Sequence, residues 1–168
     1  CGVGTKMFGS LPEYLFSLAP DDLWVDMYAD AALDWERDGG PVHVAMETPM
    51  PYNGTVALSF DCAPQSFTLH LRIPRWAAGD VDIAVNGERA ATGRPGSYAA
   101  ITRVWQAGDK VTCTLPFAWK ISLYEGAEQV EGYERYAFEY GPLLMAFRGP
   151  LHHDGYMKIP GPARDLPG

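Results

Sequence analysis

The chain has 168 residues, enough for one domain that buries roughly 70% of its extended-chain surface. Its 13 basic and 21 acidic residues give a net charge of −8. This balance disfavours nucleic acids and anionic membrane surfaces as partners, because both are bound through cationic side chains. No apolar run approaches the ~20 residues of a membrane-spanning helix, so we expect neither a nucleic acid nor a membrane as partner.

The first segment, residues 1–18, has apolar residues three or four positions apart, which is the spacing of an amphipathic helix. These residues are Met7, Leu11, Tyr14, Leu15 and Leu18. Thr5 or Ser10 could cap such a helix, and Pro12 in the first turn favours a start at Ser10 over one at Thr5. One helix cannot bury both of its sides, so we expect it to have a partner outside this chain.

Between residues 19 and 62, short apolar segments alternate with turn signals. The expected strands are 23–28, 31–36, 42–48 and 56–62. Asp38-Gly39-Gly40 and Asn53-Gly54 mark two of the turns between them. Asn53-Gly54-Thr55 also matches a glycosylation acceptor, but a turn is the preferred interpretation.

The clearest pattern lies between residues 67 and 115, where apolar and polar residues alternate with a period of two. Residues 67–73 and 81–85 are two such runs. Asn86-Gly87 follows, a dipeptide that tolerates positive φ at both central positions of a tight hairpin. Together with strands over 96–105 and 111–115, these runs predict a mainly β fold, an antiparallel, jelly-roll-like β-sandwich.

The sequence after this stretch predicts further strands at 117–124, 136–140 and 143–147. From residue 149 onward the chain has no periodicity. No charged-then-apolar leader opens the chain, and its last residues resemble a loop. We therefore expect a piece of a longer protein.

The three cysteines are far apart and odd in number, which does not indicate a disulfide framework. Cys62 and Cys113 continue apolar strand faces and are interpreted as small buried hydrophobes. Cys1 precedes a turn of small residues that opens the predicted helix, where backbone N–H groups would lower the pKa of a thiol. A nucleophile or a metal ligand is chemically reasonable there, although spacing alone favours an inert thiol.

Arg103 shares a predicted strand face with Trp105, and Asp109 lies nearby in the sequence. A cation among apolar residues must be stacked or paired, so a structural Arg–Trp contact is preferred over a sugar-binding platform. The same two interpretations apply to four other tryptophans, with packing again preferred: Trp24, Trp35, Trp76 and Trp119. The four histidines show no metal-ligand spacing.

Several short motifs, taken in order, resemble the C-terminal part of glycoside hydrolase family 127 (GH127), the β-L-arabinofuranosidase family. Residues 1–7 resemble that family's Cys-Cys-Val-Gly-Thr-Gly-Met, and 23–28 resemble its LYVNLY strand. Residues 140–144, YGPLL, resemble the entry to a second sandwich. The sandwich signature includes the residues for which we expect structural roles: Arg72, Trp76, Asn86, Gly87, Tyr98, Arg103, Trp105 and Asp109.

The resemblance implies an (α/α)6 helical barrel followed by β-sandwiches. Residues 1–18 would be the terminal helix of the barrel, 19–122 a β-sandwich, and 123–168 the opening strands of a second sandwich with an irregular tail. The upstream barrel and the parent's oligosaccharide substrate are then the expected partners. The sandwich would brace the barrel or mediate a homodimer.

The resemblance also implies chemistry. Cys1 matches a zinc-bound cysteine nucleophile, both catalytic residue and metal ligand, while the acid/base glutamate would lie upstream. Gly2 stands where the family has a second cysteine, a zinc ligand. We expect zinc in the parent enzyme, no cofactor in this chain, and no hydrolysis by this chain alone. A noncatalytic carbohydrate-binding or adhesion module is the alternative.

Overall fold

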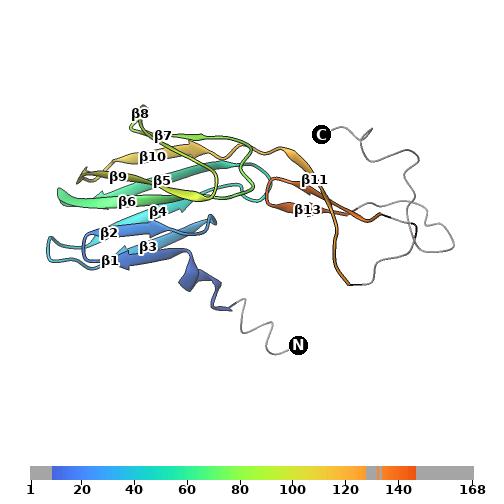
Figure 1. The fold of residues 1–168 in the computed structure, drawn as a ribbon. Coiled ribbons are helices and arrows are strands. Elements are labelled where there is room, and N and C mark those ends of the chain that lie inside the picture. The colour runs from blue at the N-terminus through green and yellow to red at the C-terminus, as the bar shows by residue number, and fades with distance from the viewer. Residues whose placement is uncertain (1–8, 128–131, 133, 147–168) are drawn as a thin grey trace. The chain divides into compact units, whose positions relative to one another are not determined.

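The computed structural model describes residues 9–127, 132 and 134–146 (Figure 1). The chain separates into two compact units, Cys1–Phe117 and Ala118–Gly168, and each is described by itself. The predicted three-part division at 18/19 and 122/123 stays a prediction. Among the described residues, no helix is both long and apolar enough to cross a membrane.

The predicted N-terminal helix is wrong for the residues that the structure describes. Residues Leu11–Tyr14 form a single 3-10 turn, η1, and Phe16–Ala19 form a strand, β1, that pairs antiparallel with β2 (Asp22–Val25). Leu15, between them, is buried. Strand pairing and core burial outweigh a helical pattern too short to be stable by itself. The residues before Gly9 lie outside the described part of the chain.

One layer of the first unit is a four-stranded sheet in the order β1-β2-β6-β9. β6 (Gln65–Ile73) and β9 (Ser97–Trp105) pair antiparallel along nine residues each and lie side by side in Figure 1. β2 and β6 are parallel, which differs from the antiparallel pairing expected throughout.

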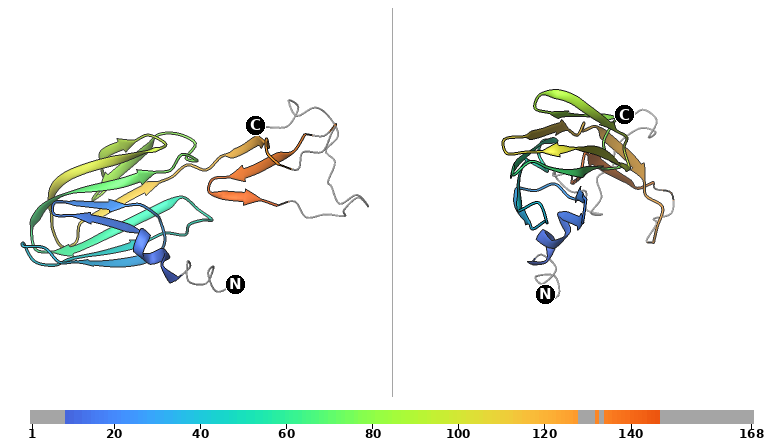
Figure 2. Two further views of the ribbon diagram at one scale, coloured as in Figure 1. Left: turned by 60° about the horizontal axis from the view of Figure 1, so that its bottom comes forward. Right: turned by 90° about the vertical axis from the view of Figure 1, so that its left-hand side faces the viewer.

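The second layer is a six-stranded antiparallel sheet in the order β3-β4-β5-β10-β7-β8 (Figure 2). Its strands are β3 (Ala31–Trp35), β4 (Val42–Glu47), β5 (Thr55–Cys62), β7 (Val81–Val85), β8 (Glu88–Gly93) and β10 (Lys110–Thr114). All but β8 were predicted as strands, either from the period-two pattern or from apolar segments between turn signals, and the predicted ends differ from the observed ones by at most one or two residues.

The hydrophobic core draws buried side chains from both sheets, which confirms the β-sandwich. Leu69 and Trp105 from the four-stranded sheet are fully buried, as are Leu58 and Met46 from the six-stranded sheet. Along β4 the residues alternate strictly between buried and exposed. The period of two therefore places one apolar face of each sheet against the other.

Two glycine-containing turns fix the ends of strands. Asn86 and Gly87 have φ of 54° and 85°, which confirms the tight hairpin predicted between β7 and β8. At Asn53-Gly54, the Asn53 side chain accepts hydrogen bonds from the backbone N–H and the hydroxyl of Thr55. A Cβ on Gly54 would lie 1.9 Å from the carbonyl oxygen of Leu115, so only glycine fits there.

The second unit contains a three-stranded antiparallel sheet, β11 (Trp119–Leu123), β12 (Tyr136–Tyr140) and β13 (Leu143–Met145). The pairing places one set of apolar side chains on one face: Trp119, Ile121, Leu123, Tyr136, Phe138, Tyr140, Leu143 and Met145. Lys120 pairs with Glu139 on the opposite face, at 3.4 Å. The sheet is therefore amphipathic.

Candidate functional site

The residue that the family resemblance assigns to catalysis and zinc, Cys1, lies outside the described residues, and so does Gly2. Their roles stay predictions. Among the residues that the structure describes, no group of three or more His, Cys, Asp or Glu side chains could hold a metal ion. These residues therefore do not fit a zinc site of their own.

The two other cysteines are buried in the sandwich, as predicted. Burial raises the pKa of the Cys113 thiol to about 11 and also raises that of Cys62. A thiol with a raised pKa stays protonated near neutral pH and is a poor nucleophile or metal ligand. Both side chains serve the packing of the core.

The residues around Asp109 form a polar cluster at one end of the sandwich, in which Asp109 itself is buried. Asp109 is only 2% exposed; its carboxylate accepts hydrogen bonds from Asn86 Nδ2 at 2.7 Å and from the backbone N–H of Gln106 at 3.0 Å. The guanidinium of Arg103 lies 3.7 Å from the same carboxylate and 5.2 Å from the Trp105 ring centroid. The cluster holds the β7–β8 and β9–β10 turns together, since Asn86 also accepts from the Lys110 backbone N–H.

Trp76 lies away from this cluster. It is partly buried and packs edge-on against Phe117, with ring centroids 5.3 Å apart. Its contacts are those of packing rather than of a platform open to a ligand.

Arg72 and Tyr98 lie at the other end of the four-stranded sheet, around Asp26. The Asp26 carboxylate accepts hydrogen bonds from the hydroxyls of Tyr98 and Ser17, and its backbone carbonyl accepts one from Arg72. The hydrogen bond to Asp26 raises the pKa of Tyr98. Tyr28 donates to the carbonyl of Arg72 at 2.6 Å.

We call the solvent-facing side of the four-stranded sheet the four-stranded outer face. Trp24 and His70 stand next to each other on it, stacked with ring centroids 4.6 Å apart and planes 7° apart. The side chain of Asp22 lies 2.7 Å from His70 Nε2 and fixes the imidazole ring. Trp24 therefore lies outside the core, unlike the buried Trp35 and Trp105.

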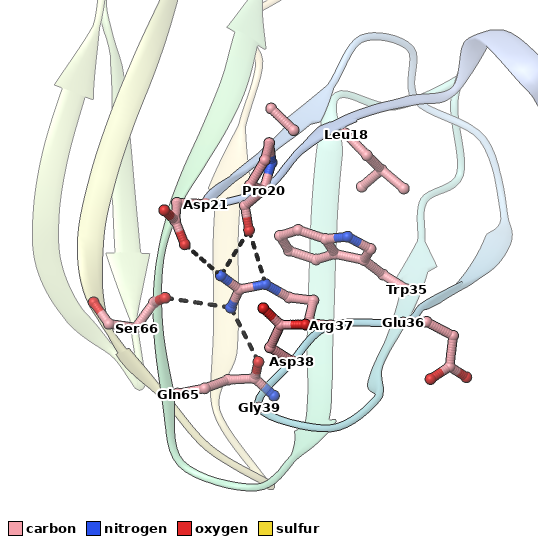
Figure 3. A pocket seen from close by; sticks show the side chains of 11 residues that line it. Leu18, Pro20, Asp21, Trp35, Glu36, Arg37, Asp38, Gly39, Gln65 and Ser66 are labelled. Atoms are coloured by element: carbon pink, nitrogen blue, oxygen red, sulfur yellow. Dashed lines mark hydrogen bonds and ion pairs between the residues drawn. The ribbon is translucent and has the colours of Figure 1, made fainter.

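A cleft of about 520 Å³ opens at the end of the sandwich beside Arg37 (Figure 3). Arg37 donates to the carbonyls of Pro20 and Ser66 and to the side chains of Asp21 and Gln65. Its guanidinium also lies 4.5 Å from the Trp35 ring centroid. With its donors engaged in this way, Arg37 joins the β1–β2 turn, the β3–β4 turn and the start of β6, and acts as a clamp.

Sequence reasoning missed the Trp24–His70 pair and the Arg37 clamp. The parallel pairing of β2 with β6 brings residues 24 and 70 together. No local pattern in the sequence predicts this pairing. The Trp35-x-Arg37 spacing at a strand end was the available signal for the clamp, because an arginine beside an aromatic residue often stacks on it.

Comparison with known families gives a direct match. A family profile described as "Beta-L-arabinofuranosidase, GH127 middle domain" matches residues 22–117. This range runs from the start of β2 to the end of the first compact unit. A search of curated proteins finds no match.

Solved structures agree with the profile. The GH127 β-L-arabinofuranosidase of Geobacillus stearothermophilus T6 is 30% identical with a TM-score of 0.69; the alignment covers 84% of this chain and 22% of that one. A GH127 β-arabinofuranosidase, BT3674, is 26% identical with a TM-score of 0.68, covering 83% and 24%. A protein titled "Glycoside hydrolase" is 26% identical with a TM-score of 0.65, covering 78% and 22%.

The chain thus spans less than a quarter of the length of each of these three structures. The profile match covers more than half of the chain and contains every strand of the β-sandwich except β1. The chain belongs to the GH127 β-L-arabinofuranosidase family, as a region that contains the family's middle domain.

Proposed function

We propose that this chain is the β-sandwich region of a GH127 glycoside hydrolase whose parent enzyme cleaves L-arabinofuranosidic bonds. The observation that carries the proposal is the profile match over residues 22–117. The sandwich braces the catalytic barrel, which lies upstream in the parent. A core shared by both sheets suits this role, because a rigid scaffold holds a neighbouring domain in a fixed position.

In this proposal Cys1 is the nucleophile of the parent. Its thiolate attacks the anomeric carbon, the leaving alcohol departs with a proton from an upstream glutamic acid, and water then cleaves the glycosyl–cysteine bond. Zinc, where the parent binds it, would hold the thiol ionised. Among the described residues, no group of three or more His, Cys, Asp or Glu side chains could hold it, so its other ligands would lie upstream. The isolated chain is therefore expected to be inactive.

The second unit fits the opening of a second sandwich. One face of its three-stranded sheet is apolar, and Trp119 and Leu123 on that face are exposed. An apolar sheet face is buried against another element in a stable domain. We propose that strands of the parent outside this chain supply that layer.

A parent protein that contains this chain and its upstream domain tests the proposal. We expect it to cleave an aryl β-L-arabinofuranoside, and Cys1→Ser to lower kcat/KM by roughly a thousandfold or more, because removing a nucleophile disables the whole catalytic unit. Cys113→Ser is the matched control and should retain most of the activity, since that thiol is buried in the core. Full activity of Cys1→Ser would overturn the assignment.

The alternative is a stand-alone carbohydrate-binding or adhesion module. It predicts that the parent has no hydrolytic activity on any arabinofuranoside. The family match favours the hydrolase over this alternative.

A further inference from the structure

The four-stranded outer face arranges its aromatic rings in an unusual way for a solvent-exposed sheet. Within one row across the sheet, the register places Ser17 beside Trp24, Trp24 beside His70, and His70 beside Ala100. The two large rings are thus adjacent and stacked, with a small residue on each side.

This row leaves part of the Trp24 ring exposed, whereas the His70 side chain is only 19% exposed. His70 covers one face of the indole from the β6 side, which leaves the second face of Trp24 on the side of β1. Ser17, the paired residue on β1, is too small to cover an indole. Apolar ring surface that remains in water is typical of a surface used for binding.

Polar groups lie in the rows on both sides of the rings. Asp22, whose side chain is 36% exposed, holds His70 from one side. Asp26 lies beyond the other side, where its carboxylate already accepts from Ser17 and Tyr98. The rings and the carboxylates are therefore held in place before any ligand arrives, which lowers the entropic cost of binding.

We propose that the four-stranded outer face binds a neutral saccharide, with a sugar ring stacked on the open face of Trp24 and its hydroxyls hydrogen-bonded to Asp22 and Asp26. The C–H face of a sugar ring is apolar and slightly positive, which suits the negative face of an indole. Sugar hydroxyls are donors, and carboxylates are their strongest acceptors. The aromatic ring of Trp24 and the carboxylates of Asp22 and Asp26 lie within a few residues of one another on this face.

The charges on this face decide between ligand classes. The net charge of −8 and the two carboxylates beside Trp24 repel acidic polysaccharides. A protein partner is disfavoured, because the centres of protein interfaces are depleted in charged residues, whereas here Asp22, Asp26 and Arg72 lie among the aromatic rings. This inference goes beyond the proposed function, since the chain would bind a saccharide whether or not the parent cleaves one.

Affinity electrophoresis of the whole 168-residue chain tests the proposal. The probes are three neutral polysaccharides, linear arabinan, arabinoxylan and mixed-linkage β-glucan, with polygalacturonate as the anionic control. We expect at least one neutral probe to retard the chain and polygalacturonate to leave it unretarded. Trp24→Ala should weaken the retardation at least tenfold, whereas Tyr52→Ala, which removes an exposed ring elsewhere in the same unit, should not change it.

A second variant distinguishes a loss of binding from a loss of folding in Trp24→Ala. Ser17→Leu keeps Trp24 and fills the space beside its partly exposed ring, so it should weaken binding at least tenfold while the chain still unfolds in one cooperative thermal transition. The proposal is overturned if no neutral probe retards the chain, if Ser17→Leu binds like the original, or if Tyr52→Ala loses binding equally. It is also overturned if sedimentation shows a dimer that Trp24→Ala dissociates, because the face would then be an interface between copies.

Discussion

The two outer faces of the sandwich differ sharply in composition. The four-stranded outer face carries a Trp–His stack, Tyr98, Arg72 and two carboxylates. The six-stranded outer face, on the opposite side, is built at its centre from small side chains: Ala32, Ala45, Ala57, Ser59, Ala84 and Thr112. Two charged pairs lie toward its margins, His43 with Asp34 and Arg89 with Asp82.

The requirements of core packing do not explain why the two outer faces differ in composition. The inward sides of both sheets are alike, with fully buried aliphatic and aromatic residues that fill one shared interior. Outward positions are free of that requirement, so their composition reflects what each face contacts. The comparison therefore separates residues that hold the fold from residues that are available for recognition.

The largest expected effect lies beneath both faces, at Trp105. Its ring is fully buried, stacks on Phe60 and Phe67, and donates from Nε1 to the Phe67 carbonyl at 3.0 Å. Trp105→Ala should lower the free energy of unfolding by about 3–5 kcal/mol. Val104→Ala, at the exposed neighbouring position, should change it by about 0.5 kcal/mol or less. Urea denaturation measures both, and similar values would contradict the assignment of inward and outward positions.

The next effect concerns the Arg37 clamp, which joins turns from the two sheets. Arg37→Ala leaves the carbonyls of Pro20 and Ser66 without their donor, so we expect a loss of about 2–4 kcal/mol. Arg37→Lys should recover less than half of this, because an ammonium cannot reproduce the planar fork.

Arg89 provides the matched control for the clamp. Its ion pair with Asp82 lies at 3.2 Å on the six-stranded outer face, and its side chain is largely exposed. Arg89→Ala should therefore cost about 0.5 kcal/mol or less. Equal losses for the two arginines in chemical denaturation would refute the clamp.

A smaller difference is expected between hydroxyl groups on the two outer faces. Tyr98→Phe removes the hydrogen bond to Asp26 and should cost about 0.5–1.5 kcal/mol, whereas Thr112→Val should change the stability by about 0.5 kcal/mol or less. The raised pKa of Tyr98 gives a second measurement by ultraviolet titration. The stabilisation is present below the unfolded pKa of about 10 and is lost as pH rises through the folded pKa. Asp26→Asn should bring this pKa back toward its ordinary value.

The smallest effect is at His43 on the six-stranded outer face. The hydrogen bond with Asp34, at 2.5 Å, raises the pKa of His43. The pair therefore stabilises the fold below the ordinary histidine pKa of about 6.5, and this contribution disappears as pH rises through the raised value. In a proton NMR titration, Asp34→Asn should lower the His43 pKa. An unchanged pKa would show that Asp34 is not the cause.

The strands and the core could be predicted well from the sequence, because a period of two is a local signal. The run from Phe67 to Ile73 became β6, and the Asn86-Gly87 turn has the expected positive φ values. The family resemblance, carried by short motifs in order, agrees with the profile match. These features depend on neighbours in sequence.

The remaining features depend on pairing between distant segments. The 3–4 spacing before residue 19 resembled a helix, but Phe16–Ala19 pairs as an edge strand with β2. The parallel register of β2 on β6, which joins Trp24 to His70, follows from tertiary packing alone. The same holds for Arg37, whose partners come from the β1–β2 turn and the start of β6. Candidate recognition residues were therefore harder to predict than the fold.

Chemical-shift mapping tests the contrast between the two outer faces most directly. Oligosaccharides of the neutral polysaccharide that retards the chain most would be titrated into the isotope-labelled chain while backbone amide signals are followed. The account predicts shifts confined to the neighbourhood of Ser17, Trp24, His70 and Ala100 on the four-stranded sheet, with unchanged signals at Ala45, Ala57 and Thr112. Shifts centred on the six-stranded outer face, or no shifts at any saturating concentration, would contradict it.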